Sequence, residues 1–391
     1  MDFNLTEEQS LLKDSVEKFI GDNYDLNDRR KLAQSTLGYS EDFWKQYADL
    51  GWLGLPFSES EGGFGGDLID TMIMMEELGK GLILEPYYAS VILAGAALRN
   101  GGTAEQKDKL IGGIVSGDIK ATVAYSEEQA RFNLNDVATT AEKSGDGYVI
   151  SGTKSVVANA ETADFIIVAA RTSGERADAK GITLFVVDAK SEGVSLANYP
   201  TVDALRASEV TFANVKVSAS DIMGELDNGL GLLEEIRDEA ILALCAEAVG
   251  GMDLLYKDTV DYCKQREQFG HALSDFQTLK HRFSEMFIEA EQCRSLLYRA
   301  TLEKNNGSAD SRKLIHALKY KVGKAGRFIG QGAVQSHGGM GVTEELRIGH
   351  YFIRLAVIDS MFGNFDYHLD QYTELMTIPD DKGEEDSMPF M

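Results

Sequence analysis

The stretch SGDGYVISG, residues 144–152, decides the fold class because it places a turn of Gly and Asp beside a segment of alternating polarity. Together with the preceding TTAEK segment, this pattern is typical of a β-hairpin. Two apolar runs, FIIVAA at 165–170 and ITLFVV at 182–187, are typical of buried strands. We therefore predict a small β-barrel or sandwich over residues 119–228.

Helical periodicity flanks this β segment on both sides. Thr6 and Gln9 form a capping-box pattern, and apolar residues follow it at helical spacing. The C-terminal third contains long helical segments with few breakers, which favours an antiparallel bundle. The predicted fold class is α+β. Its domains are an N-terminal helical domain (1–118), the β domain (119–228) and a C-terminal helix-bundle domain with a polar tail (229–391).

The composition argues against some classes of partner. The chain has 391 residues and a formal net charge of −25. Nucleic-acid backbones are bound by clustered Lys and Arg, so this acidity argues against a nucleic-acid partner. A CoA-type anion would need a local basic pocket within the acidic surface.

Other sequence features bear on location and metal content. No run of about 18 apolar residues occurs, so we expect no membrane span. Cys245, Cys263 and Cys293 lack the spacing of metal ligands, so we expect no metal site. The N-terminal residues are acidic and amphipathic, unlike a signal or transit peptide, which predicts a cytoplasmic protein.

Four short motifs occur in order along the chain. They are GYVISGTK at 147–154, LRASEVTFANV at 205–215, REQFG at 266–270 and QSHGGMG at 335–341. Together with the order helices, β domain, helices, they resemble the acyl-CoA dehydrogenase family over residues 1 to about 375. The resemblance implies a flavoprotein oxidoreductase that uses FAD to introduce an α,β double bond into an acyl-CoA substrate. It also implies electron-transfer flavoprotein as the electron acceptor.

Part of the flavin site matches the family pattern. The resemblance assigns cofactor binding to Arg266, Phe269, Gln335, Gly338 and Gly339. In the family these groups reach across a dimer interface to the flavin held by the neighbouring subunit. An Arg presents the fork of donors that a pyrophosphate accepts, and paired glycines allow close backbone approach. The alternative for Arg266 is a surface ion pair with a residue such as Glu267.

The part of the site that a subunit supplies to its own flavin differs from the family pattern. The family's loop Thr-Glu-Pro-x-Ala-Gly-Ser-Asp appears as SEEQARFNLND at 126–136, where Arg131 and Phe132 add bulk. The aromatic residue and the Thr that follow the family's Lys are Val156 and Ala158 here. Losing a stacking contact and a hydrogen bond costs about 1 to 3 kcal/mol. We therefore expect the chain alone to bind little FAD.

The catalytic base of the family is also missing. The segment RLAVIDSMFGN at 354–364 resembles the one that carries the catalytic Glu, but Gly363 stands in its place. The alternative family position, on the long helix before Gly250, holds Ala240. Glu239 and Asp366 are the remaining candidates, and both are also explained as ordinary helix charges. The catalytic residue is therefore left open.

Three hypotheses fit these features. The first is the subunit of a heteromeric FAD-dependent acyl-CoA dehydrogenase that lacks the base and completes the flavin site of a homologous, base-bearing subunit. Such enzymes are similar to those acting on CoA thioesters of steroid side chains, fatty or dicarboxylic acids, and the acyl group stays open. The second is a self-sufficient homo-oligomeric dehydrogenase with a non-standard carboxylate. The third is a non-catalytic scaffold or binding protein.

Overall fold

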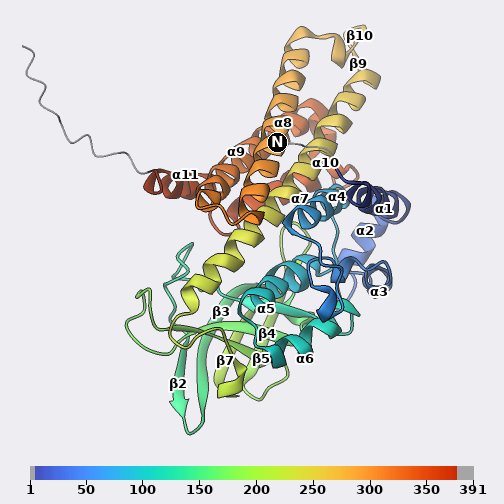
Figure 1. Cartoon of the computed structure of the whole chain (residues 1–391). Coiled ribbons are helices and arrows are strands. Elements are labelled where there is room, and N and C mark those ends of the chain that lie inside the picture. The colour runs from blue at the N-terminus through green and yellow to red at the C-terminus, as the bar shows by residue number, and fades with distance from the viewer. Residues whose placement is uncertain (1–4, 377–391) are drawn as a thin grey trace, which may run out of the picture.

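The computed structural model describes residues 5–376, and the polar tail predicted from Asp380 onward lies outside them. The described chain has the predicted order of helices, sheet and helices (Figure 1). The predicted domain limits fall near connections: α6 ends at Val115 before β1 begins at Ala121, and β8 ends at Met223 before α7 begins at Gly229. The exact limits stay a prediction.

The N-terminal part is helical, as predicted. The predicted capping box is present: the Thr6 hydroxyl accepts from the Gln9 backbone N–H, and the Gln9 side chain accepts from the Thr6 N–H. The α-helices are α1 (Glu7–Asn23), α2 (Leu26–Ala33), α3 (Glu41–Asp49), α4 (Leu68–Gly81), α5 (Gly95–Gly101) and α6 (Ala104–Val115). A π-helical turn, Tyr88–Ala94, leads into α5.

The middle part is a mixed sheet built around the predicted hairpin. Its strands are β1 (Ala121–Ala124), β2 (Thr140–Ser144), β3 (Gly147–Ala158), β4 (Phe165–Arg171), β5 (Ile182–Asp188), β6 (Val194–Pro200), β7 (Arg206–Ser218) and β8 (Ile222–Met223). They pair in the order β6-β7-β3-β2-β4-β5-β8, and β1 runs parallel to β4. Ser144 pairs with Gly147 across the two-residue turn, so the hairpin is confirmed.

The C-terminal part is a bundle of long helices. They are α7 (Gly229–Gln265), α8 (Gln277–Asn305), α9 (Ser311–His337), α10 (Arg347–Ser360) and α11 (Phe365–Glu374). A small hairpin of β9 (Glu267–Gln268) and β10 (His271–Ala272) joins α7 to α8 at the end far from the sheet (Figure 1). No helix within residues 5–376 is long and apolar enough to cross a membrane.

Two glycines bring α4 and α7 into close contact. A Cβ on Gly250 would lie 1.8 Å from the Glu76 carbonyl oxygen, and one on Gly79 would lie 2.2 Å from that of Glu247. No other residue fits at either crossing point without moving a helix backbone. This contact places Glu247 of α7 against α4, where a cavity begins.

Candidate functional site

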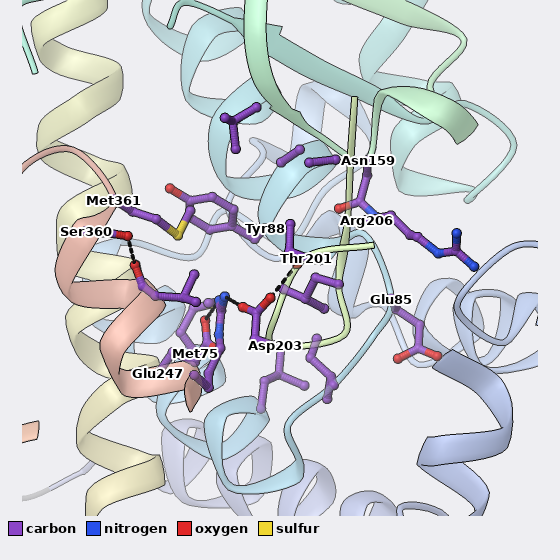
Figure 2. Close-up of a pocket in the computed structure, with 18 residues that line it drawn as sticks. Met75, Glu85, Tyr88, Asn159, Thr201, Asp203, Arg206, Glu247, Ser360 and Met361 are labelled. Atoms are coloured by element: carbon purple, nitrogen blue, oxygen red, sulfur yellow. Dashed lines mark hydrogen bonds and ion pairs between the residues drawn. The ribbon is translucent and has the colours of Figure 1, made fainter. Parts of the chain in front are cut away.

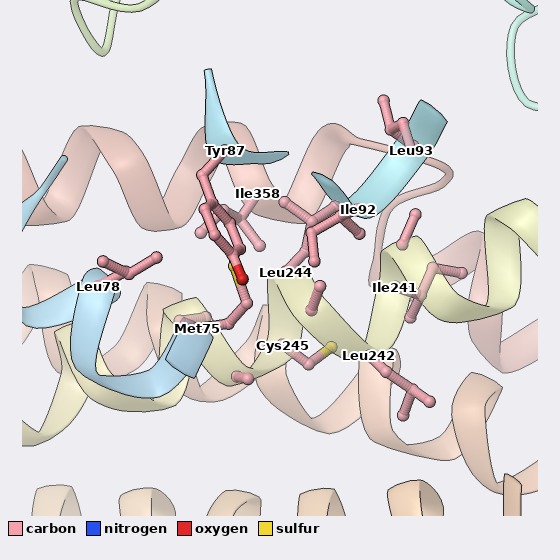
Figure 3. Close-up of a cluster of buried hydrophobic side chains, with 14 of the residues drawn as sticks. Met75, Leu78, Tyr87, Ile92, Leu93, Ile241, Leu242, Leu244, Cys245 and Ile358 are labelled. Carbon is pink, nitrogen blue, oxygen red and sulfur yellow. The ribbon is translucent and has the colours of Figure 1, made fainter. Parts of the chain in front are cut away.

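A cavity of about 150 Å³ lies between α4, α7, α10 and the sheet domain. Met75, Leu78, Val357 and Met361 form much of its apolar wall. The wall continues into the main core of the chain (Figure 3), to which Met75 and Leu78 also belong. An apolar cavity of this kind suits an uncharged organic chain.

One side of the cavity carries a buried ion cluster. Arg354 donates from Nε and Nη2 to the two carboxylate oxygens of Glu247, at 2.6 and 2.7 Å, and from Nη1 to Asp203 Oδ2 at 2.7 Å. Burial disfavours the guanidinium charge, but the two carboxylates outweigh burial and raise the pKa of Arg354. Asp203 and Glu247 lie together in Figure 2, with Glu85 on the other side of the cavity. Both oxygens of Glu247 are thus engaged, which makes it a poor general base.

Glu85 is a second buried carboxyl on this cavity. It accepts hydrogen bonds from the Tyr24 hydroxyl and, at 3.2 Å, from the Ser40 N–H. Among residues 5–376, no cation forms an ion pair with Glu85. Burial raises the pKa of Glu85 to about 7. Glu85 is therefore an uncharged acid over part of the neutral pH range.

The sequence-predicted carboxylates lie elsewhere. Glu239 forms an ion pair with Arg99 and accepts from Asn100 Nδ2 at 2.8 Å, while Asp366 is exposed in the first turn of α11. Neither side chain lines the cavity. Gly363, at the family's base position, offers only its backbone carbonyl, which accepts from Lys319 Nζ at 2.9 Å. A catalytic role for Glu239 or Asp366 stays a prediction.

Aromatic side chains fill the contact between the sheet domain and the C-terminal helices. We call this contact, formed by Tyr125, Phe132, Phe362 and Tyr367, the seam. The rings of Tyr125 and Phe362 stack with centroids 4.6 Å apart and planes 11° apart. The bulk of Phe132 packs against Tyr367 of α11, with ring centroids 5.2 Å apart. Gly363 and the altered loop both lie at this seam. The aromatic rings of the chain itself therefore occupy the space between them.

Val156 occupies a strained position next to this seam. It has a φ of 53°, lies at a register shift of β3 and is 60% exposed. A β-branched residue rarely adopts positive φ, and such outliers concentrate at functional sites. Val156 and Ala158 both line the cavity, yet neither offers a ring or a side-chain hydrogen bond to a flavin.

The altered loop is nevertheless firmly anchored. Lys154 Nζ contacts Glu127 Oε1 at 2.6 Å, and both side chains are buried. Burial alone would raise the pKa of Glu127, but Lys154 and neighbouring N–H donors outweigh it and lower the pKa to about 2. The altered loop is therefore held in one place by an internal ion pair.

The residues assigned to cofactor binding meet at the other end of the bundle. Arg266, Gln335, Gly338 and Gly339 line one open groove of about 870 Å³. Phe269 is not among the lining residues; it lies at the tip of the β9–β10 hairpin and is 90% exposed. The motifs REQFG and QSHGGMG, far apart in the sequence, are thus brought together.

The groove contains guanidinium groups without ion-pair partners in the described chain and a backbone segment that no side chain covers. Arg266 and Arg282 line it, and neither has an ion-pair partner among residues 5–376. The alternative pairing of Arg266 with Glu267 does not form. A Cβ on Gly338 or Gly339 would meet nothing within 4 Å, so the backbone there is open to an incoming group. Guanidinium donors beside open backbone suit a pyrophosphate.

Three functional features were missed at the level of sequence. Glu247 is the one charged residue in the run AILALCAEAVGGM at 240–252, and that isolated charge was a usable signal of a buried partner. Arg282 and Asp203 carry no local signal. Each joins its cluster only through the tertiary fold.

Comparisons with known proteins point to one family over most of the described chain. Three family models match: the acyl-CoA dehydrogenase N-terminal domain at residues 6–118, the middle domain at 122–215 and the C-terminal domain at 227–376. L-prolyl-[peptidyl-carrier protein] dehydrogenase of Serratia sp. is 29% identical over 91% of this chain and 93% of its own length. The CarC subunit of the caffeyl-CoA reductase–Etf complex of Acetobacterium woodii is 29% identical over 79% and 83%. A variant of the Tcur3481–Tcur3483 steroid ACAD is similar in structure, with a TM-score of 0.85, 28% identity and coverage of 94% and 97%.

Proposed function

Because the chain belongs to the acyl-CoA dehydrogenase family, whose oxidoreductases use FAD, we propose that it is one subunit of a two-chain dehydrogenase. In this proposal it lacks the catalytic base and completes the flavin site of a homologous, base-bearing partner. The observation that carries the proposal is the contrast between an open groove with unpaired arginines and a seam closed by the chain's own rings.

The groove fits the cofactor. Arg266 would neutralise part of the pyrophosphate, and Gly338 and Gly339 would let the backbone approach it closely. Phe269 would pack on a flat part of the cofactor, and the Gln335 amide would hydrogen-bond to it. These groups are largely available: Arg266 forms no ion pair among the described residues, the backbone at Gly338 and Gly339 is open, and the exposed ring of Phe269 makes only an edge contact with Phe276.

The chain's own seam does not fit the cofactor. A flat ring system placed beside Gly363 would have to separate Tyr125 from Phe362, which already stack on each other. Val156 and Ala158 would offer the flavin neither a stacking contact nor a side-chain hydrogen bond. We therefore derive no reaction step at this seam.

Exposed apolar side chains occur at this end of the bundle. Met340 lines the groove and is 45% exposed, and Phe269 of the β9–β10 hairpin is 90% exposed. Clustered apolar residues around a polar centre are typical of a surface that another chain covers. We propose that the base-bearing subunit covers this end of the bundle.

The substrate class in this proposal is an acyl-CoA thioester. Held by Arg266, Gln335 and the Gly338–Gly339 backbone, a bound flavin would supply hydride-accepting chemistry, and a carboxylate of the partner chain would serve as the base for the α-proton. The likeness to a steroid ACAD named for two gene products supports a two-chain enzyme acting on a steroid-type acyl group. The relative in a complex with Etf supports electron-transfer flavoprotein as acceptor. A cytoplasmic location stays a prediction.

Purification alone and with a partner tests the proposal. The chain is expressed by itself, and also together with an acyl-CoA dehydrogenase-like chain encoded beside it. We expect little bound flavin and no turnover for the single chain, and one flavin per pair with turnover for the complex. A homo-oligomer of this chain that retains near-stoichiometric flavin and oxidises acyl-CoA would overturn it.

A further inference from the structure

A second hollow, of about 470 Å³, lies on the outer side of the segment 200–206. Its walls come from α2, from that segment and from residues 342–353. It shares Thr201 and Arg206 with the cavity described above, so the two spaces are neighbours. We call this hollow the basic chamber. Its charged and titratable residues are Arg29, Arg30, Arg206, Glu344 and His350.

Arg29 is a buried cation without a carboxylate partner. Nε donates to the Leu82 carbonyl at 2.5 Å and Nη2 to the Asp203 carbonyl at 3.1 Å. It makes no ion pair with any residue of 5–376, and burial lowers its pKa to about 10. Backbone carbonyls satisfy its donors, and the nearby carboxylates of Asp203 and Glu247, which are bonded to Arg354, partly offset its charge.

Arg206 is also without a neutralising partner. Nη2 donates to the Ser35 carbonyl at 2.8 Å, while Nε is buried with no hydrogen bond. The side chain extends away from Asp203 and Glu247 in Figure 2. No carboxylate of the described chain forms an ion pair with it. Arg206 thus borders the basic chamber as a positive charge without a carboxylate partner in the described chain.

Among residues 5–376, one carboxylate lines the basic chamber, and it is already paired. Glu344 contacts Arg30 Nη2 at 2.7 Å, and its backbone carbonyl accepts from His350. Burial lowers the pKa of His350, so this ring adds no charge near neutral pH. The Asp203–Glu247–Arg354 cluster beside Arg29 carries one net negative charge, which offsets the charge of Arg29. Arg30 and Arg206 against Glu344 then leave one positive charge in excess. In a chain of net charge −25, such a local excess is attractive to an anion.

We infer that the basic chamber is an anion-binding site for a carboxylate or a phosphate group. Arg30 and Arg206 are the charged side chains placed to receive it. The neighbouring cavity suggests one source, an acyl chain whose far end carries a carboxylate. A free phosphate entering from solvent is the other source. The inference does not depend on how the chain assembles.

Calorimetric titration of the full chain at constant ionic strength tests the inference. The probes are inorganic phosphate, acetate and hexanoate, whose alkyl tail would extend toward the apolar cavity. We expect saturable binding of one anion per chain. Tighter binding of hexanoate than of acetate identifies the acyl source, and binding of phosphate alone identifies the free-anion source. No saturable binding of any probe would overturn the inference.

Two positions that are not buried, the half-buried Arg30 and the exposed Glu344, reduce the risk of unfolding. Arg30→Gln should weaken the binding about tenfold, because one charge-assisted hydrogen bond is lost. Glu344→Gln should tighten it severalfold, because Arg30 is released from its competing carboxylate. The matched control is Lys31→Gln, which removes the same charge one residue away and does not line the basic chamber. If Arg30→Gln and Lys31→Gln weakened anion binding equally, the binding would reflect the general electrostatic potential of this surface, and the inferred site would be refuted.

Discussion

Replacing Arg266 by Ala separates a cofactor-binding role from a structural one. The side chain is exposed and has no ion pair in the described chain, so its removal breaks no internal contact. The free energy of unfolding should therefore change by no more than about 0.5 kcal/mol. A charge-assisted hydrogen bond to a pyrophosphate is worth about 1.5 to 3 kcal/mol. The affinity of the complex for FAD should fall about 10- to 150-fold.

The assay measures flavin retained by the co-purified complex and FAD titrated back after stripping. Gln335→Ala should weaken FAD binding less, since a neutral amide contact is worth about 0.5 to 1.5 kcal/mol. The expected order of flavin occupancy is wild type, Gln335→Ala, Arg266→Ala. Arg299→Ala is the matched control, because Arg299 is exposed on α8, has no ion pair in the described chain and does not line the groove. An Arg266→Ala complex that assembles and keeps full flavin would refute the reasoning.

Three further predictions follow from the other sites. Glu239→Gln should leave turnover of the complex within about twofold and cost about 1 kcal/mol of stability through its Arg99 contact; lost turnover with flavin retained would favour a self-sufficient enzyme. Val156→Trp should raise flavin retention by the isolated chain, measured by absorbance, because a ring restores about 0.5 to 1.5 kcal/mol of stacking; unchanged retention would assign the deficit to the Tyr125–Phe362 stack. Glu85, with a folded pKa of about 7 against an ordinary 4.5, contributes stability that is full below pH 4.5 and lost as pH rises through 7. Urea unfolding at pH 5 and pH 8 should show a loss larger by up to about 3 kcal/mol in wild type than in Glu85→Gln, and equal losses would contradict it.

Local patterns were sufficient to predict the fold. The hairpin at 144–152 depends on a turn and alternating polarity within nine residues, and the capping box at Thr6 depends on four. Both signals are complete within one short segment. The three-part order of the fold followed from where these periodicities change along the sequence.

The interior of the candidate site was not predictable in the same way. Asp203, Glu247 and Arg354 come from three parts of the chain, and only the close α4–α7 contact brings Glu247 to the cavity. The stacking of Tyr125 on Phe362 also joins distant residues. Nothing local in a sequence specifies such pairs. The groove residues were grouped beforehand only because the motifs resembled a family in which they act together.

The two halves of the flavin site differ in whether the fold accounts for their residues. In the seam, Phe362 packs on Tyr125 and the added ring of Phe132 packs on Tyr367, so both rings have an internal role. In the groove, Arg266 and Phe269 have no comparable internal role, and an exposed ring carries a cost in solubility. A chain with only a structural function gains nothing from keeping these two residues exposed. A chain that completes the site of another subunit needs them exposed, and it also needs its own seam closed against a second flavin.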